Sequence, residues 1–403
     1  MIQIAVLGYG IVGSGVVEVI ERNNAEVSRR AGEEMHVKYI LDLRDFPGDP
    51  YEEKVVHDYN LILEDAQISI VCEVMGGVGD AYQFTRQALE AGKSVCTSNK
   101  ELVAKHGAEL IALAAANGCH YMFEASVGGG IPIIRTINNA MTPERIEAVT
   151  GILNGTTNYM LTKMEQESAD YEEVLKQAQA LGYAERNPEA DVEGHDACRK
   201  IAILSSLMAG KNVDSEKLYT EGIKGIAAAD FAFAKEANMT IKLLARAKLM
   251  EDGSILAMVA PFMVPKDHVL AMVNDVFNGV FVTGNMLGDT MLYGHGAGKL
   301  PTASAVAADV IECARNQGRQ ILCIWEETEA KLVDVAESER KFFVRAKRDG
   351  GKAVEDVFAG SICLELAEYP NELGFITPVM KERELQAGCE ALGDLILNKI
   401  RLM

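Results

Sequence analysis

The sequence predicts an α/β fold, with a doubly wound parallel sheet followed by an α+β domain and a small C-terminal α+β domain. Three observations support this prediction. Apolar strand patterns alternate with amphipathic helix patterns over residues 1–130. Near Ala148 the alternation changes to one strand, three helices and further strands, and a shorter set of strands follows a charged stretch at 326–331. The length of 403 residues also exceeds that of one ordinary core.

The chain opens with an apolar run at 2–7 that is typical of a buried parallel strand and ends in a glycine-rich turn. Glycines at 8, 10 and 13 permit a tight turn, close approach to a pyrophosphate and close packing of the helix expected over 11–22. The first amides of that helix can bind phosphate. The turn therefore predicts a Rossmann-type dinucleotide site, although glycines also cluster in ordinary turns. The expected cofactor contacts are Gly8, Gly10, Ile11, Val12 and Gly13.

Four more strands are expected in this region, at 37–43, 68–74, 94–97 and 120–123, with helices at 78–91 and 100–117. The second helix ends at Asn117-Gly118, a common stop signal. Residues 1–130 are therefore predicted to form an NAD(P)-binding Rossmann domain. An apolar helix at 303–316 is expected to return and complete it.

Residues 131–302 and 335–403 are predicted to form two α+β domains. The first has expected strands at 149–153, 256–264 and 279–282 and helices between 158 and 209. The second has expected strands at 342–347, 361–366, 374–377 and 395–401 and a helix at 381–392. The charged stretch at 326–331 is interpreted as the linker between them.

Composition restricts the classes of function. A net charge of −20 disfavours binding to nucleic acid or anionic lipid. Eight cysteines without a CxxC pair predict reduced core residues of a cytoplasmic protein, and no zinc framework is visible. The chain begins with a strand instead of a basic, apolar leader, and no apolar stretch reaches spanning length, so we expect no membrane association.

The end of the second expected strand bears on the choice of cofactor. An acid at this position suits the ribose of NAD, whereas an arginine suits the extra phosphate of NADP. If the strand runs through Leu43, Arg44 lies at its carboxyl end, which favours NADP(H) over NAD(H). The alternative is that Arg44 pairs with Asp42 or Asp45 at a solvated turn.

A lysine on an apolar helix face is the sharpest anomaly of the middle region. At roughly 100° per residue, Asp196, Ala197 and Leu204 fall within about 60° of Lys200. A desolvated ammonium is costly unless it is paired, and such lysines can act as proton donors or bases. The alternative is an ordinary i,i+4 ion pair at the rim of a core.

Three loops carry polar or glycine-rich sequence. Glu185 and Asp191 stand in a loop punctuated by Gly and Pro, where they could bind a cationic group or remain solvated. Residues 154–158, Asn-Gly-Thr-Thr-Asn, could hold a carbonyl or nicotinamide amide, or could cap a helix. Residues 124–132 could turn backbone carbonyls toward a cation, or could form a hinge.

These segments together resemble the homoserine dehydrogenase family over at least residues 1–315. The resemblance is carried by Thr97-Ser98-Asn99-Lys100, the segments 124–132 and 154–158, Gly182-Tyr183-Ala184-Glu185, and the stretch from Asp191 to Asp196 that leads to Lys200. It implies NAD(P)H-dependent interconversion of L-aspartate 4-semialdehyde and L-homoserine in threonine, methionine and isoleucine biosynthesis. It also implies a homodimer or homotetramer.

The resemblance implies roles for individual residues. Lys200, together with Asp196, is expected to be catalytic, with Lys200 donating a proton to the aldehyde oxygen. The residues expected to bind substrate are Glu185, Asp191, Asp196 and Lys100. Further cofactor contacts are expected at Thr97, Ser98, Lys100, Gly182 and Gly298, besides Arg44. A sodium ion is expected at Glu124, Val127, Gly129 and Ile131, mainly on backbone carbonyls.

Alternatives remain at the level of the sequence. The chain could be another Rossmann oxidoreductase acting on an amino-acid-derived substrate, or a non-catalytic dinucleotide sensor. A semialdehyde dehydrogenase would need a thiol nucleophile, but Cys198 lies off the Lys200 face of its helix. The tail resembles an ACT domain in its order of elements, yet residues 348–352 match the usual glycine-rich opening only in part. Threonine inhibition is therefore not implied.

Overall fold

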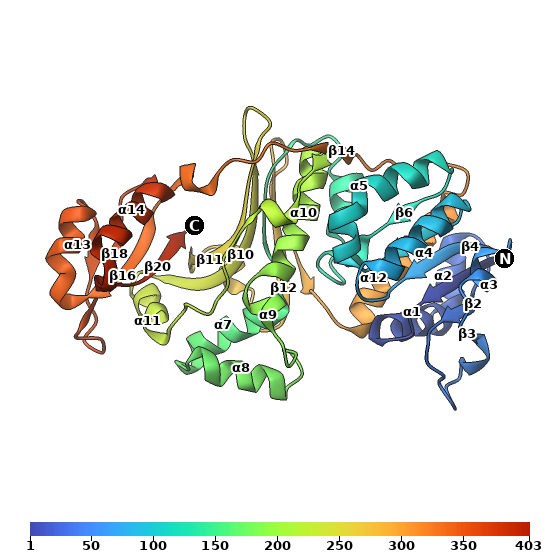
Figure 1. The fold of residues 1–403 in the computed structure, drawn as a ribbon, viewed down its shortest axis with the longest axis horizontal. Helices are drawn as coiled ribbons and strands as arrows, with labels where there is room; N and C mark the ends of the chain where they lie inside the picture. Colours follow the sequence, from blue (N-terminus) through green and yellow to red (C-terminus); the bar gives the residue numbers. More distant parts are fainter. The chain divides into compact units, whose positions relative to one another are not determined.

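The computed structural model describes all residues from Met1 to Met403. Contacts divide them into two compact units, each described by itself below. The first unit comprises Met1–Arg145, Ala202–Ser215 and Gly294–Ala330, and the second comprises Ile146–Ile201, Glu216–Tyr293 and Lys331–Met403. Figure 1 shows the elements of both units in chain order.

A six-stranded parallel sheet in the order β3-β2-β1-β4-β5-β6 forms the centre of the first unit, which confirms the predicted doubly wound fold. Its strands are β1 (Ile2–Leu7), β2 (Met35–Leu41), β3 (Val55–Val56), β4 (Ile68–Glu73), β5 (Ser94–Thr97) and β6 (Tyr121–Met122). Its helices are α1 (Ile11–Arg22), α2 (Asn24–Ala31), α3 (Asn60–Leu63), α4 (Gly79–Glu90), α5 (Lys100–Ala116), α6 (Ile133–Arg135) and α12 (Lys299–Arg315).

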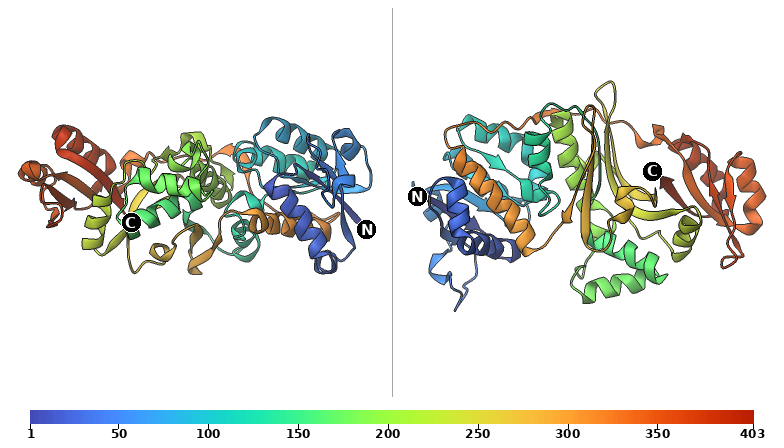
Figure 2. Two further views of the ribbon diagram at one scale, coloured as in Figure 1. Left: turned by 90° about the horizontal axis from the view of Figure 1, so that it is seen from below. Right: turned by 180° about the vertical axis from the view of Figure 1, so that it is seen from behind.

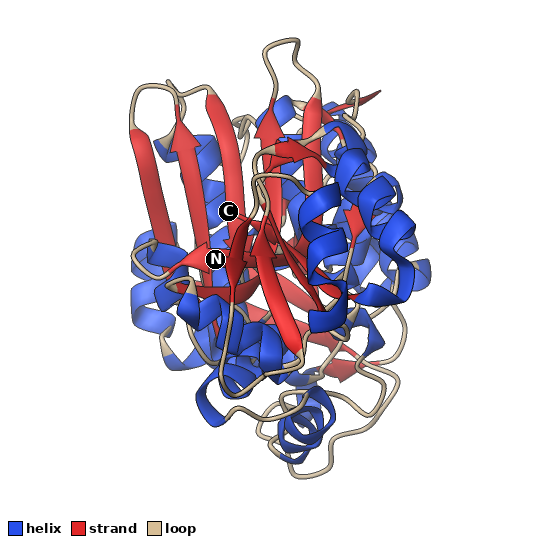
Figure 3. Cartoon of the chain, turned by 90° about the vertical axis from the view of Figure 1, so that its left-hand side faces the viewer, coloured by secondary structure: helices blue, strands red, loops and turns tan.

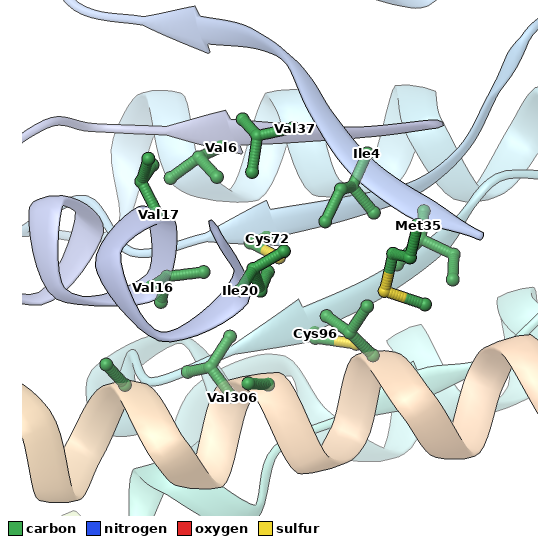
Figure 4. Packing of buried hydrophobic residues seen from close by; sticks show 14 of the residues in the cluster. Ile4, Val6, Val16, Val17, Ile20, Met35, Val37, Cys72, Cys96 and Val306 are labelled. Carbon is green, nitrogen blue, oxygen red and sulfur yellow. The ribbon is translucent and has the colours of Figure 1, made fainter. Parts of the chain in front are cut away.

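Helices α1 and α12 lie side by side against the sheet, although almost 280 positions separate them in the sequence (Figures 1 and 2). Val16 and Ile20 of α1 and Val306 of α12 pack with Ile4 and Val6 of β1 in one buried cluster (Figure 4). Close packing requires a glycine in α1, since a Cβ on Gly15 would lie 2.8 Å from the carbonyl oxygen of Lys299. The returning helix therefore supplies part of the core of the cofactor-binding fold.

The second unit is built on a ten-stranded mixed sheet (Figure 3). Its path runs β13-β12-β7-β10-β11-β20-β16-β18-β17, and β9 pairs with β11. The first part contains β7 (Ile146–Ile152), α7 (Gly155–Glu167), α8 (Tyr171–Ala180), α9 (Glu189–Val192), α10 (His195–Ala209), β9 (Tyr219–Thr220), α11 (Ala228–Glu236), β10 (Met239–Leu249), β11 (Ile255–Pro265), β12 (Phe277–Gly284) and β13 (Gly288–His295). Residues of α10 from Ala202 on belong to the first unit. Strand β10, which the sequence analysis does not predict, pairs with β11 along its whole length.

The tail forms a βαββαβ arrangement whose antiparallel strands continue this sheet. Its elements are β15 (Glu339–Arg340), β16 (Phe342–Lys347), α13 (Gly351–Val357), β17 (Ile362–Leu364), β18 (Glu372–Ile376), β19 (Met380–Lys381), α14 (Glu382–Leu392) and β20 (Ile396–Leu402). Helices α13 and α14 share a core with one face of β16, whereas Phe343 on the other face contacts Phe233 of α11. Strand β20 pairs with β11, and residues 335–403 thus share a sheet with the rest of the second unit.

Two local expectations are wrong. Strand β2 ends at Leu41 and not at Leu43, because the chain turns at Asp42. The stretch from Glu326 is not simply a linker, since β14 (Glu326–Glu329) pairs with β8 (Lys211–Asn212) in the first unit. None of the eight cysteines forms a disulfide, and none of the helices is both long and apolar enough to span a bilayer.

Candidate active site

The turn between β1 and α1 has the geometry that a dinucleotide requires. Gly8 has a φ of +93°, in the left-handed region that favours glycine. A Cβ on Gly13 would lie 1.9 Å from the carbonyl oxygen of Gly8, so no larger residue fits there. Gly10 precedes the first turn of α1, and a Cβ added to it would meet nothing within 4 Å. The amides of this helix start, including that of the exposed Ile11, are therefore open to a phosphate.

Asp42, the first residue after β2, ties the glycine turn to the loop that follows the strand. Its carboxylate accepts a hydrogen bond from the backbone N–H of Tyr9 at 2.8 Å. It also accepts bonds from the Arg44 backbone N–H at 3.0 Å and from Nε at 2.9 Å. The bonded guanidinium holds the pKa of Asp42 well below its usual range. Arg44 therefore pairs with Asp42 and not with Asp45, and its exposed side chain lies over the ring of Phe46.

A buried carboxyl that the sequence analysis misses joins the ends of β4 and β5. Glu73, the last residue of β4, accepts bonds from the Thr97 hydroxyl at 2.6 Å and the Met75 N–H at 2.8 Å. Thr97 in turn accepts a bond from the N–H of Asn99, which caps α5 just before Lys100. Burial raises the pKa of Glu73 to about 7. The visible signal was an acid at the end of an apolar strand, three residues before Gly76-Gly77.

Lys200 lies in the second unit, in the middle of α10, and is 8% exposed. Its ammonium donates to the carbonyl oxygen of Leu153 at 2.7 Å and to Asp196 Oδ2 at 2.8 Å. Asp196 stands one turn earlier in the first turn of the helix, where the helix dipole favours a negative charge. The predicted buried Lys200–Asp196 pair is thus present, and the Leu153 carbonyl is a partner that the sequence did not reveal.

Asn154 connects this pair to a third candidate residue. Its Nδ2 donates to Asp191 Oδ1 at 2.7 Å and to Asp196 Oδ2 at 2.9 Å. Its Oδ1 accepts a bond from the backbone N–H of Thr157 and caps α7. The loop therefore caps α7, as one of its two interpretations predicts. The same amide also orients two acids, which the sequence analysis does not predict.

The loop after α8 carries the remaining substrate candidate. Gly182 ends the helix with a φ of +77°, and the Tyr183 N–H bonds back to the Ala178 carbonyl. The Thr156 hydroxyl donates to the carbonyl oxygen of Tyr183 at 2.7 Å, which ties the loop to α7. The carboxylate of Glu185 is exposed and accepts no hydrogen bond, so it does not join the Asn154–Asp196 network.

The segment from Glu124 to Ile131 leaves backbone carbonyls available. The Glu124 side chain is already engaged, because it accepts bonds from the N–H groups of Ile134 at 2.8 Å and Arg135 at 2.7 Å. The carbonyl oxygens of Val127 and Gly129 accept no backbone hydrogen bond. Oxygen atoms of this kind suit a hard cation such as sodium.

The start of α12 packs onto the same turn. The Gly130 N–H donates to the His295 carbonyl oxygen at 3.1 Å, and a Cβ on Gly129 would lie 2.6 Å from Gly296. Gly298 precedes the helix with a φ of +118°. The first unit therefore contains the candidate cofactor contacts Gly8, Gly10, Ile11, Val12, Gly13, Arg44, Thr97, Ser98, Lys100 and Gly298. Gly182 and Lys200 lie in the second unit.

Comparisons with known sequences give a consistent result. A family profile described as homoserine dehydrogenase matches residues 132–311, and one described as the homoserine dehydrogenase NAD binding domain matches residues 8–124. The chain is 43% identical over 323 residues to the homoserine dehydrogenase of Bacillus subtilis, a match that covers 78% of this chain and 73% of that protein. It is 44% identical over 315 residues to the Synechocystis homoserine dehydrogenase, covering 77% and 72% of the two chains.

Solved structures extend the likeness to the tail. A homoserine dehydrogenase from Thiobacillus denitrificans matches with a TM-score of 0.91 at 34% identity, covering 100% of this chain and 98% of that one. A hyperthermophilic archaeal homoserine dehydrogenase in complex with NADPH matches with a TM-score of 0.66 at 28% identity, covering 77% and 97%. This chain therefore belongs to the homoserine dehydrogenase family, and it is an oxidoreductase that acts on a CH–OH group with a nicotinamide dinucleotide.

Proposed function

We propose that the protein reduces L-aspartate 4-semialdehyde to L-homoserine, and catalyses the reverse reaction, with Lys200 as the proton donor to the aldehyde oxygen. The observation that carries this role is the bonding of the Lys200 ammonium. Two of its three N–H groups are held by Asp196 and the Leu153 carbonyl, which leaves one for a substrate oxygen. When bound, a reduced nicotinamide supplies the hydride that adds to the carbonyl carbon. Lys200 stabilises the negative charge that builds on the oxygen and delivers the proton that completes the hydroxyl.

The acids around Lys200 suit the amino-acid end of the substrate. Asp191 and Asp196 are held by the Asn154 amide, and Glu185 offers an exposed carboxylate. We assign these three acids to the substrate ammonium and Lys100 to the junction of substrate and cofactor. Together with the family membership, this makes residues 131–302 the substrate-binding and catalytic domain and 1–130 with 303–316 the cofactor domain.

Exchange of Lys200 tests the assignment. We expect Lys200→Ala to lower kcat by about 10²–10⁴-fold, the usual contribution of a general acid, while the Kd for the dinucleotide stays the same. Cys198→Ala, on the same helix, is the matched control and should retain kcat, because the mechanism needs no thiol. Stopped-flow or steady-state measurement of NADPH oxidation gives kcat, and fluorescence titration gives the Kd. Wild-type turnover by Lys200→Ala would disprove the role, and loss of turnover in Cys198→Ala would point to a thiol mechanism.

We assign NADP(H) in preference to NAD(H). The residues of the β1–α1 turn fit a pyrophosphate, and Thr97, Ser98, Gly182 and Gly298 complete the proposed contacts. The choice between cofactors depends on Arg44, which neutralises Asp42 and keeps an exposed guanidinium at the end of β2. A phosphate on the ribose would otherwise meet an unpaired carboxylate.

The second prediction concerns this cofactor preference. Arg44→Ala is expected to raise the KM for NADPH by about tenfold or more and to leave the KM for NADH within about twofold, because a charge-assisted bond to phosphate is worth about 1.5–3 kcal/mol. The neighbouring exposed substitution Asp45→Ala serves as the control. Equal changes for both cofactors would show that Arg44 supports only the fold of the loop.

We also propose a sodium ion on the carbonyl oxygens of Glu124, Val127, Gly129 and Ile131.

A homodimer, or a homotetramer, is proposed through the second sheet. The exposed apolar side chains of Met286, Leu287 and Tyr293 at the β12–β13 edge support this assembly. Light scattering checks the assembly, and sodium titration of activity checks the ion. The family membership supports a place in threonine, methionine and isoleucine biosynthesis, and eight cysteines without a disulfide are consistent with the reducing cytoplasm.

A further inference from the structure

A histidine that the proposed chemistry does not use lies at the edge of the first sheet where the cofactor ribose is expected. His57 is the residue directly after β3, and Asp42 is the residue directly after β2. The two strands are parallel neighbours, and the Asp42 N–H donates to the Val56 carbonyl oxygen at 3.2 Å. The carboxyl ends of both strands therefore meet at one edge, and a Rossmann domain recognises the ribose at the end of its second strand.

Both ring nitrogens of His57 face acceptors on the loop that follows β2. Nδ1 lies 2.7 Å from the carbonyl oxygen of Asp42, and Nε2 lies 3.1 Å from Oδ1 of Asp45. A carbonyl oxygen and a carboxylate oxygen can only accept, so each contact needs a proton on the imidazole nitrogen. A neutral imidazole carries only one such proton. The two contacts are thus both satisfied only by the protonated, cationic ring.

The surroundings of the ring act in the same direction. The bond to the Asp42 carbonyl and the Asp45 carboxylate raise the pKa of His57 above its ordinary value, although desolvation opposes the rise. The carboxylate of Asp58, the next residue, accepts bonds from Asn60 instead. The side chain of His57 is 52% exposed, so a ligand at this edge of the sheet can reach the ring.

The pairing of charges in the loop depends on this proton. Arg44 neutralises Asp42, and the protonated His57 neutralises Asp45, so each of these two acids has a cationic partner. When the ring loses its proton, the charge of Asp45 is no longer compensated. A ribose that bears a phosphate is repelled by that charge, whereas a ribose with a free hydroxyl is not.

We propose that His57 is a specificity-determining residue whose cationic ring favours the phosphate-bearing dinucleotide NADP(H) over NAD(H). Discrimination between the two cofactors is accordingly strongest in mildly acidic solution and weakens as the ring loses its proton. The inference rests on the assignment of NADP(H) above, and it adds to Arg44 a second cation that comes from the neighbouring strand.

Fluorescence titration of the full chain with NADPH and with NADH, at pH 6.5 and at pH 8.5, tests this inference. In the wild type, the ratio of the two Kd values is expected to fall about fivefold between these pH values, because one charge–charge attraction near the surface is lost. In His57→Gln, the preference for NADPH should be low at both pH values. The ribose phosphate itself titrates at about pH 6, but it does so for wild type and variant alike.

Two further variants separate the charge of His57 from its hydrogen bonds. His57→Lys keeps a positive charge at both pH values and should retain the preference for NADPH at pH 8.5. His36→Gln is the matched control with the wild-type profile, because His36 contacts Glu34 near the opposite end of β2. Parallel profiles for wild type and His57→Gln, or a His57→Lys variant that behaves like His57→Gln, would overturn the inference. The proposed reaction is judged separately, by turnover of the semialdehyde with either cofactor.

Discussion

Two buried ionisable side chains, Lys200 and Glu73, lie in different electrostatic surroundings. Lys200 has a carboxylate partner at 2.8 Å and a backbone carbonyl, so its positive charge is compensated. Glu73 accepts only neutral donors, from Thr97 and Met75, and has no cation beside it. Burial consequently raises its pKa from 4.5 to about 7. The first residue is the proposed proton donor, whereas the second positions the strand ends that carry Thr97.

The raised pKa of Glu73 predicts a pH-dependent stability. The folded protein binds this proton more tightly than the unfolded chain, so the stabilisation is complete below pH 4.5 and is lost as the pH rises toward 7. The loss amounts to about 3 kcal/mol in the free energy of unfolding. In Glu73→Gln this loss should be absent. Denaturant unfolding at pH 5 and pH 8 measures the difference, with the exposed Glu53→Gln as the control. Parallel pH profiles for wild type and Glu73→Gln would contradict the prediction.

At the scale of elements, the glycine turn and strand β10 show opposite relations between local sequence and structure. The turn is specified locally, because Gly8 needs a positive φ and Gly13 has no room for a Cβ. Strand β10 is rich in Leu, Ala, Lys and Arg, which are good helix formers. It is nevertheless a strand, since β7 and β11 pair with its two edges. Tertiary pairing here overrides local propensity.

The turn therefore yields a prediction at the same scale. Gly13→Ala would place a Cβ 1.9 Å from the Gly8 oxygen and must displace the turn. We expect the Kd for the dinucleotide to rise at least about tenfold, which corresponds to about 1.4 kcal/mol. Gly225→Ala, where a Cβ meets nothing within 4 Å, is the matched control. Fluorescence titration provides the measurement, and an unchanged Kd for Gly13→Ala would refute the assigned phosphate-binding role.

At the scale of the whole molecule, buried ion pairs attach the tail to the rest of the second unit. Asp230 of α11 accepts bonds from Arg345 Nε at 2.7 Å and Asn398 Nδ2 at 2.7 Å. Arg345 also bonds to Glu372. These contacts hold one face of the tail sheet against α11, so the tail and the strands before it form one mixed sheet.

Asp230→Ala is accordingly expected to destabilise the second unit. It leaves the buried Arg345 guanidinium without its main partner, at a cost of about 3–5 kcal/mol in the free energy of unfolding. Lys352→Ala, which removes an exposed pair with Asp356, should cost less than about 0.5 kcal/mol. Thermal and denaturant unfolding measure both values. Similar small losses in the two variants would show that α11 does not hold the tail in place.

Much of the candidate site could be predicted because its signals are local. Lys200 and Asp196 are four residues apart on one helix, so helical periodicity alone brings them together. Glu73 and the Leu153 carbonyl could not be assigned in this way. Their partners come from other elements, and only the folded chain places Glu73 beside Thr97 and the ammonium beside residue 153.

The amino-acid sequence by itself determined the Rossmann turn, the strand and helix periodicities and the Lys200–Asp196 pair, because each depends on neighbours within one or two turns of chain. The tertiary structure alone decided that Arg44 pairs with Asp42, that β10 is a strand and that Asn154 orients two acids. The physical reason is that pairing and burial depend on groups far apart in the sequence. Their free energies are set by the desolvation and hydrogen bonds of the assembled fold.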